Sequence, residues 1–152
     1  MGHRCRLHCL AALYHVRMGQ SSSPAQEAGG REFTPTPDAA PAAREFVVAL
    51  GGIADSESLL RLKTLASEIV TNAILHARTP FSVVVTADTA HVRVAVRDRS
   101  SALPVKRDYG PDHPTGRGLH IVEALADRWG VEPEDDGKTV WFELDRESAG
   151  VA

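Results

Sequence analysis

The segment Ala66–Ala77 reads Ala-Ser-Glu-Ile-Val-Thr-Asn-Ala-Ile-Leu-His-Ala and combines an apolar helical pattern with three polar side chains. Apolar residues recur here at the three- and four-residue spacing of an α-helix. Glu68, Asn72 and His76 are four residues apart, so we expect them to form a ladder on one helix face. A carboxylate and a carboxamide one turn apart could hold a hard cation and activate a hydroxyl. An isolated pair of this kind is more often a solvated surface, so the rest of the chain has to decide between these interpretations.

The composition is that of one soluble globular domain. A chain of 152 residues is long enough to bury a real core. Its 43% hydrophobic and 24% charged residues are ordinary values. The net charge of -3 gives no electrostatic reason to expect nucleic acid or an anionic membrane as a partner. No apolar run approaches the length of a membrane-spanning helix, and the sequence therefore predicts a cytoplasmic protein.

Residues 1–30 differ in composition from the rest of the chain. They hold closely spaced cysteines and histidines, namely His3, Cys5, His8, Cys9 and His15. This crowded pattern lacks the paired knuckles of a zinc site, and the short apolar stretch Leu10–Tyr14 is not typical of a secretory signal. We expect a disordered, dispensable tail over residues 1–30, with a metal site in that tail as the alternative. A domain over 31–146 and a short tail over 147–152 follow.

The other elements are predicted from periodicity and from residues that end helices and strands. Helical spacing of apolar residues predicts helices, and alternation of valine with polar residues predicts strands. The expected elements are a strand over 31–34, a helix over 38–50 that Gly51-Gly52 stops, a helix capped by Asp55 or Ser56 and running to about Ala77, strands over 81–87 and 91–97 joined as a hairpin, a helix over 118–129, and strands over 131–132 and 139–144 paired across Asp136-Gly137. This order indicates an α+β sandwich with helices on one face of a sheet.

Two further motifs follow the helix that carries Glu68. Asp98-Arg99-Ser100 ends an expected strand, where Asp98 could point into a pocket or serve as an ordinary turn residue. Gly116-Arg117-Gly118 opens an expected helix, whose free backbone amides suit a phosphate. A glycine-containing helix cap is the alternative. The chain has neither the third glycine of a dinucleotide fingerprint nor a G-x-x-x-x-G-K-[ST] phosphate loop.

The order and context of these motifs resemble the GHKL ATPases, the superfamily of gyrase, histidine kinases and mismatch-repair ATPases. The segment Glu68–Ala77 resembles the N box of that superfamily, and Val96–Ser100 resembles its first G box. The segment Thr115–Val122 resembles the second G box, and Gly137–Phe142 is similar to the closing strand. Over about residues 31–145 the chain resembles bacterial anti-sigma factor serine kinases, especially the short actinobacterial forms. The resemblance implies a two-layer α/β sandwich of the Bergerat type, with helices on one face of a mixed, mostly antiparallel sheet.

The resemblance also implies a role for each site residue. Asn72 would be the side-chain ligand of Mg²⁺, an ion that usually keeps waters and bridges to nucleotide phosphates. Glu68 would be the catalytic residue that accepts a proton from the attacking hydroxyl or water. Asp98 would accept the exocyclic amine of adenine, with Thr139 beside it. The other residues implied at the ATP site are His76, Ser100, Gly116, Gly118 and Leu119.

Three features leave alternatives open. The first G box usually reads D-x-G-x-G, whereas Asp98–Ala102 has neither glycine. His76 either contacts a phosphate or packs and caps the helix end. The segment Ser101–Thr115 has no helical or strand period and joins the adenine and phosphate motifs, so we expect a lid that ATP orders, with a passive surface loop as the alternative.

The leading functional expectation is an Mg·ATP-binding anti-sigma regulator. It would sequester a sigma factor and phosphorylate a serine or threonine of an anti-anti-sigma antagonist of the STAS type, with a homodimer as an option and no direct nucleic-acid or membrane partner. The alternative is a protein-interaction module that binds ATP and a partner without transferring phosphate. Glu68 favours the kinase, and the missing glycines of the first G box leave room for the module.

Overall fold

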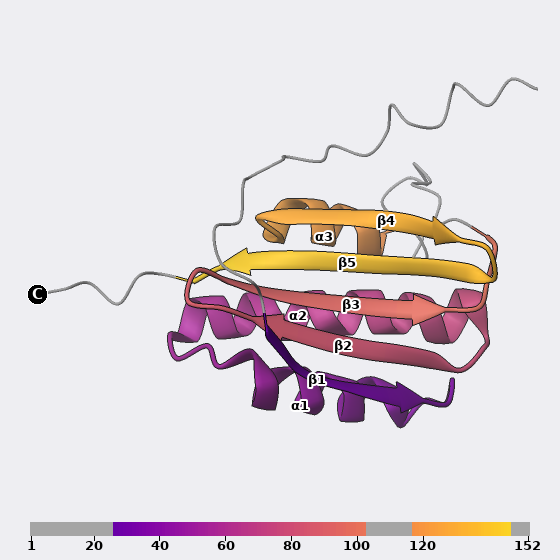
Figure 1. Ribbon diagram of the computed structural model, residues 1–152, viewed down its shortest axis with the longest axis horizontal. Coiled ribbons are helices and arrows are strands. Elements are labelled where there is room, and N and C mark those ends of the chain that lie inside the picture. Colours follow the sequence, from indigo (N-terminus) through magenta and orange to yellow (C-terminus); the bar gives the residue numbers. More distant parts are fainter. Residues whose placement is uncertain (1–25, 103–116, 147–152) are drawn as a thin grey trace, which may run out of the picture.

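The computed structural model describes residues 26–102 and 117–146. The elements are β1 (Gln26–Phe33), α1 (Ala39–Gly51), α2 (Ser56–Asn72), the π-helix η1 (Ala73–Ala77), β2 (Phe81–Ala87), β3 (His91–Asp98), α3 (Arg117–Leu125), β4 (Arg128–Glu134) and β5 (Gly137–Asp145). The five strands form one sheet in the order β1-β2-β3-β5-β4, and the helices cover one face of it (Figure 1). The predicted α+β fold class is confirmed.

All four strand pairings in the described residues are antiparallel. The family resemblance implied a mixed, mostly antiparallel sheet, whereas the described part of the sheet is entirely antiparallel. The predicted hairpin of β2 and β3 forms, with Phe81 opposite Asp98 and Ala87 opposite Val92. The second predicted hairpin also forms, but its strands are longer and its turn is Asp135-Asp136, because Glu134 already pairs with Gly137.

The core lies between the sheet and the helices. On β3 the side chains of Val92, Val94 and Val96 are buried, since alternate residues of a strand point to the same face. They pack in one cluster with Leu62 and Ile69 of α2. Burying each such aliphatic side chain contributes roughly 1.5–3 kcal/mol, so this cluster fixes how α2 lies on the sheet.

Strand β1 begins at Gln26, earlier than the predicted start at residue 31 and inside the segment assigned to the tail. The run Ala28-Gly29-Gly30 has no alternating pattern, which is why periodicity missed it. Packing explains the first of the two glycines, because a Cβ on Gly29 would lie 2.8 Å from Cδ1 of Leu50 on α1. Gly29 thus leaves room for the Leu50 side chain, although sequence patterns treat glycine as a strand breaker.

The C-terminal end of α1 and the N-terminal end of α2 agree with the sequence-based expectation. Gly52 follows α1 in the left-handed region with φ 60°, which stops the helix. Asp55 caps α2, and its Oδ1 accepts a hydrogen bond of 2.7 Å from the backbone N–H of Ser58. The choice that the sequence left open between Asp55 and Ser56 is thereby resolved.

The helix that carries Glu68 does not continue as an α-helix to Ala77. It changes at Ala73 into the π-helix η1, and the backbone N–H of Arg78 bonds to the carbonyl of Ala73 at 3.2 Å. Arg78 itself has φ 54°, so the chain leaves the helix through a left-handed residue before Thr79-Pro80. A π-turn is rare and concentrates at functional sites, and no periodicity in the sequence marks it.

Helix α3 ends at Leu125, and the predicted extension to Trp129 is wrong. The carbonyl of Leu125 accepts from the guanidinium of Arg61 at 2.6 and 3.0 Å. Two residues later the backbone N–H of Asp127 bonds to the carbonyl of Glu143, which brings the chain into the sheet. Trp129 is consequently a buried residue of β4. None of the helices in residues 26–102 and 117–146 is long and apolar enough to cross a membrane.

Candidate functional site

Helices α2 and α3 bring three of the predicted site residues together. A Cβ placed on Gly118 would lie 3.0 Å from Oε2 of Glu68, 3.4 Å from Oδ1 of Asn72 and 3.5 Å from its Nδ2. The first turn of α3 therefore lies against the carboxylate and the carboxamide of α2, and glycine is the residue that leaves this space open. The motifs are far apart in sequence, and the fold brings a carboxylate, a carboxamide and a helix N-terminus together.

Glu68 is set apart from a surface carboxylate by its surroundings. Burial raises the pKa of Glu68 above its ordinary value, because leaving water disfavours the charged form. The side chain is still only partly covered. A carboxylate of raised basicity beside an open position is suited to accept a proton.

Few protein side chains at this site could bind a divalent cation. Within the described ranges, no group of three or more histidine, cysteine, aspartate or glutamate side chains could hold a metal ion. Asn72 offers one carboxamide oxygen next to the opening of α3. Mg²⁺ commonly binds through one or two protein oxygens, waters and substrate phosphates, so this donor set fits an ion that arrives with a nucleotide.

The third member of the predicted ladder is on the π-helical turn that follows α2. His76 is exposed within η1, where hydrogen bonds span five residues rather than four. The regular α-helical stacking of Glu68, Asn72 and His76 is therefore broken after Asn72. The described residues do not place His76 in contact with the other two.

Asp98 ends β3 on the face that the helices cover. Its side chain is only 3% exposed, and its Oδ1 accepts hydrogen bonds from Nζ of Lys138 at 3.0 Å and from the backbone N–H of Ser100 at 2.8 Å. Lys138 is 5% exposed. Of the two interpretations that the sequence left open, a buried carboxylate and a turn residue, Asp98 fits both, because it is buried and also accepts from the backbone of the turn. Its side-chain partner is Lys138, which no sequence pattern singled out.

Thr139 does not lie beside Asp98, and this part of the family-based assignment is wrong. The register of β3 and β5 pairs Asp98 with Lys138 and Arg97 with Thr139. Successive strand residues point to opposite faces, so Thr139 is on the face away from the helices. Its Oγ1 donates to Oε1 of Glu134.

The turn after β3 is held by close backbone contacts. A Cβ on Gly137 would come within 1.9 Å of the carbonyl oxygen of Asp98, so only glycine fits there. The backbone N–H of Arg99 donates to Oγ1 of Thr79 at 3.1 Å. Ser100 accepts at its Oγ from the N–H of Ala102, so its hydroxyl shapes the turn in place of the missing glycines.

The remaining predicted residues divide into two groups. The Leu119 side chain is 5% exposed in the core, which leaves its backbone amide as the group that could face a phosphate. Gly116 lies outside the described residues, and so does the predicted lid from residue 103 onward. The cysteine- and histidine-containing tail is likewise outside them.

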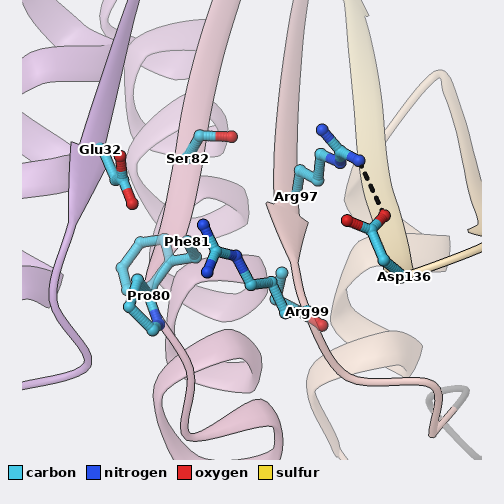
Figure 2. Close-up of a pocket in the computed structure, with 8 residues that line it drawn as sticks. Glu32, Pro80, Phe81, Ser82, Arg97, Arg99 and Asp136 are labelled. Atoms are coloured by element: carbon cyan, nitrogen blue, oxygen red, sulfur yellow. Dashed lines mark hydrogen bonds and ion pairs between the residues drawn. The ribbon is translucent and has the colours of Figure 1, made fainter.

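A polar hollow of about 200 Å³ lies at the end of the sheet where β3 ends and β5 begins (Figure 2). It is lined by Glu32, Pro80, Phe81, Ser82, Arg97, Asp98, Arg99 and Asp136. Nη2 of Arg97 donates a hydrogen bond of 3.0 Å to Oδ1 of Asp136. Ser82 and Arg97 point away from the helices, so this hollow opens on the opposite face from the Glu68 and Asn72 group. Asp98 is the one predicted site residue among the residues that line it.

Comparison with known proteins identifies the family and agrees with the fold. The family model described as Histidine kinase-like ATPase domain matches residues 33–144. No curated protein matches the chain. Among solved structures, the RsbU and RsbW domains of Rv1364c from Mycobacterium tuberculosis are similar, with a TM-score of 0.55 and 22% sequence identity. The similarity covers 82% of this chain and 35% of that chain, so it concerns the fold and about a third of that protein.

Proposed function

The chain belongs to the histidine kinase-like ATPase family, and from that premise we propose that it is an anti-sigma regulator that binds Mg·ATP and phosphorylates a serine or threonine of an anti-anti-sigma antagonist. It also sequesters a sigma factor in this proposal. The observation that carries the proposal is the packing of Gly118 against Glu68 and Asn72. The similarity to a protein whose described domains include RsbW supports the choice of regulator.

Each residue has one task in the proposed reaction. The amides that open α3 hold the phosphates, because the first turn of a helix leaves N–H groups unpaired. Asp98 accepts a hydrogen bond from the exocyclic amine of adenine. Asn72 would hold the magnesium ion through its carboxamide oxygen. Bound Mg²⁺ supplies charge neutralisation on the phosphates.

Glu68 acts on the acceptor hydroxyl. The hydroxyl oxygen of the antagonist attacks the γ-phosphorus while its proton passes to the Glu68 carboxylate. The bond from the γ-phosphorus to the β,γ-bridging oxygen breaks, and ADP leaves with that oxygen. The raised pKa of Glu68 brings its basicity closer to that of a working general base.

The test is phosphoryl transfer to candidate antagonists encoded by neighbouring genes. We expect the antagonist to gain the mass of one phosphoryl group on incubation with the protein and Mg·ATP. Glu68→Gln should bind ATP with nearly unchanged affinity and transfer phosphate roughly 10²–10⁴-fold more slowly. Asn72→Ala should weaken Mg·ATP binding instead. Transfer at the wild-type rate by Glu68→Gln would assign the base elsewhere.

The second candidate is an ATP-binding interaction module without transfer. The turn after Asp98 favours this candidate, because Ser100 shapes it where the family has the glycines of the first G box. Under this alternative, wild-type protein binds ATP and its partner, and the antagonist mass stays unchanged.

A further inference from the structure

An ion pair is buried beneath the helices where β3 ends and β5 begins. Nζ of Lys138 lies 3.0 Å from Oδ1 of Asp98, and the two side chains are 6% and 3% exposed. Neighbouring positions on the same face, Val96 and Val140, are apolar and buried. Lysine is almost never buried unless paired, and apolar residues can replace such pairs without loss of stability. A contribution to stability is therefore a weak explanation for this pair.

The carboxylate keeps hydrogen-bonding capacity beside the lysine. In the described part of the chain, both hydrogen bonds recorded at Asp98 go to Oδ1, from Lys138 and from Ser100. Carboxylate oxygens accept at about four lone-pair positions, and an ammonium carries three donors. The pair thus presents an acceptor and a cationic donor side by side, with the exposed residues Ser101 and Ala102 following directly along the chain.

This pattern is complementary to one edge of adenine. The exocyclic amine on C6 is a donor, and the adjacent ring nitrogen N1 is an acceptor. We propose that Lys138 is a base-specificity residue that donates to N1 of adenine while Asp98 accepts from the exocyclic amine. The inference rests on the proposed ATP site and extends it to a residue that periodicity and motif matching did not single out.

The register of the sheet supports this role over one for Thr139. Asp98 and Lys138 are direct partners across β3 and β5, whereas Thr139 pairs with Arg97 on the other face. A one-residue shift in register would exchange the two side chains between faces. The close approach of Gly137 to Asp98 keeps this register in place.

The first test changes the ligand and leaves the protein intact. Wild-type protein is titrated by calorimetry with Mg·ATP, with 1-deaza-ATP, in which N1 is replaced by CH, and with 7-deaza-ATP as a control on the opposite edge. We expect 1-deaza-ATP to bind about ten- to a hundred-fold more weakly than ATP, the usual weight of a hydrogen bond to a charged group. We expect 7-deaza-ATP to bind like ATP.

The second test changes the lysine. Lys138→Met removes the donor with similar bulk, and it should reduce the difference between ATP and 1-deaza-ATP to less than about two-fold. Lys138→Arg keeps a cation beside Asp98 and should retain a preference for ATP, which covers the case in which the methionine variant fails to fold. Lys63→Met removes an exposed lysine on α2 and should leave both affinities unchanged.

The outcomes separate this inference from the proposed function. Absence of ATP binding by the wild type overturns both. Equal binding of ATP and 1-deaza-ATP by the wild type overturns only the role of Lys138. Tighter ATP binding by Lys138→Met also overturns it, because the lysine would then compete with the base for Asp98.

Discussion

Gly118 is the residue whose lack of a side chain matters most to the site. A Cβ there would press on Glu68 at 3.0 Å, closer than most real contacts of a Cβ, and touch Asn72 at 3.4 Å. We expect Gly118→Ala to change stability by less than about 1 kcal/mol, because alanine favours the helix while the contact opposes it. The rate of phosphoryl transfer should fall roughly 10–100-fold, since displacing the Glu68 carboxylate would misalign it with the acceptor hydroxyl.

Thermal unfolding and transfer kinetics measured on the same preparations check this prediction. Ala124→Gly is the matched control, because it lies on the exposed side of α3. It should lose up to about 1 kcal/mol of stability and keep full activity. Wild-type kinetics in Gly118→Ala would mean that Glu68 and Asn72 do not act together.

Glu68 should destabilise the folded protein when it is ionised. In the unfolded chain its carboxyl has the ordinary pKa, and burial raises the pKa in the folded state. The folded state therefore binds the proton more tightly, and stability falls as pH rises from the unfolded pKa through the folded one. Glu68→Gln carries no such penalty and should be more stable than wild type at pH 7.

Urea unfolding as a function of pH measures this difference. The two proteins should converge below the unfolded pKa, where wild-type Glu68 is protonated in both states. Glu57→Gln, in the first turn of α2, serves as a control because it neutralises an exposed carboxyl on the same helix. A constant difference between wild type and Glu68→Gln at all pH values would point to packing instead of charge.

At the scale of elements, the outer face of the sheet is held by charged side chains from β3, β4 and β5. Glu143 accepts hydrogen bonds from Nε of Arg128 and from Nη1 of Arg93, the latter at 3.2 Å. The Arg93 guanidinium also lies 3.9 Å from the ring centre of Trp141. This cluster joins three strands on the side that no described helix covers.

Glu143 is expected to stabilise this cluster in a pH-dependent way. Burial alone would raise the pKa of Glu143, but the bonds and charges of Arg128 and Arg93 outweigh it and lower the pKa. The stabilisation is therefore complete above the unfolded pKa and is lost as pH falls through the folded pKa. Glu143→Gln should cost about 1–2 kcal/mol at neutral pH, a deficit that shrinks in acid.

Equilibrium unfolding at neutral and acidic pH tests the cluster. The control is Glu132→Gln, because Glu132 pairs with the same Arg93 at 3.3 Å but is 59% exposed. Screened surface pairs of this kind contribute less than about 1 kcal/mol. If the two variants lose the same amount, burial has not strengthened the Glu143 contacts.

For the whole molecule, local patterns predicted the elements and long-range pairing decided the details of the site. Valine alternation and the aspartate and glycine ends were sufficient for the β2–β3 hairpin, the Asp55 cap and the stop at Gly52. The end of α3 was not predictable in this way, because Arg61 and Glu143 set it from distant parts of the chain.

The partner of Asp98 shows most clearly what local sequence patterns could not predict. Lys138 and Thr139 are neighbours in sequence, and only the register with β3 decides which one lies under the helices. The π-turn after Asn72 is a second case, since it moves His76 off the expected ladder without changing the apolar pattern. Motif order supplied the candidate site residues, and strand register and helix type decided which of them lie close together.

The sheet order has a consequence for the order of events during synthesis. β5 is the last described strand to leave the ribosome, yet it lies between β3 and β4 and carries the partner of Asp98. The helices and β1–β3 can gather early, as chains fold from the N-terminus while they grow. Lys138 joins Asp98 only when this strand inserts, so in the proposed site a nascent chain stalled before β5 would have the α2 carboxylate in place but would lack one of the two groups that recognise the base.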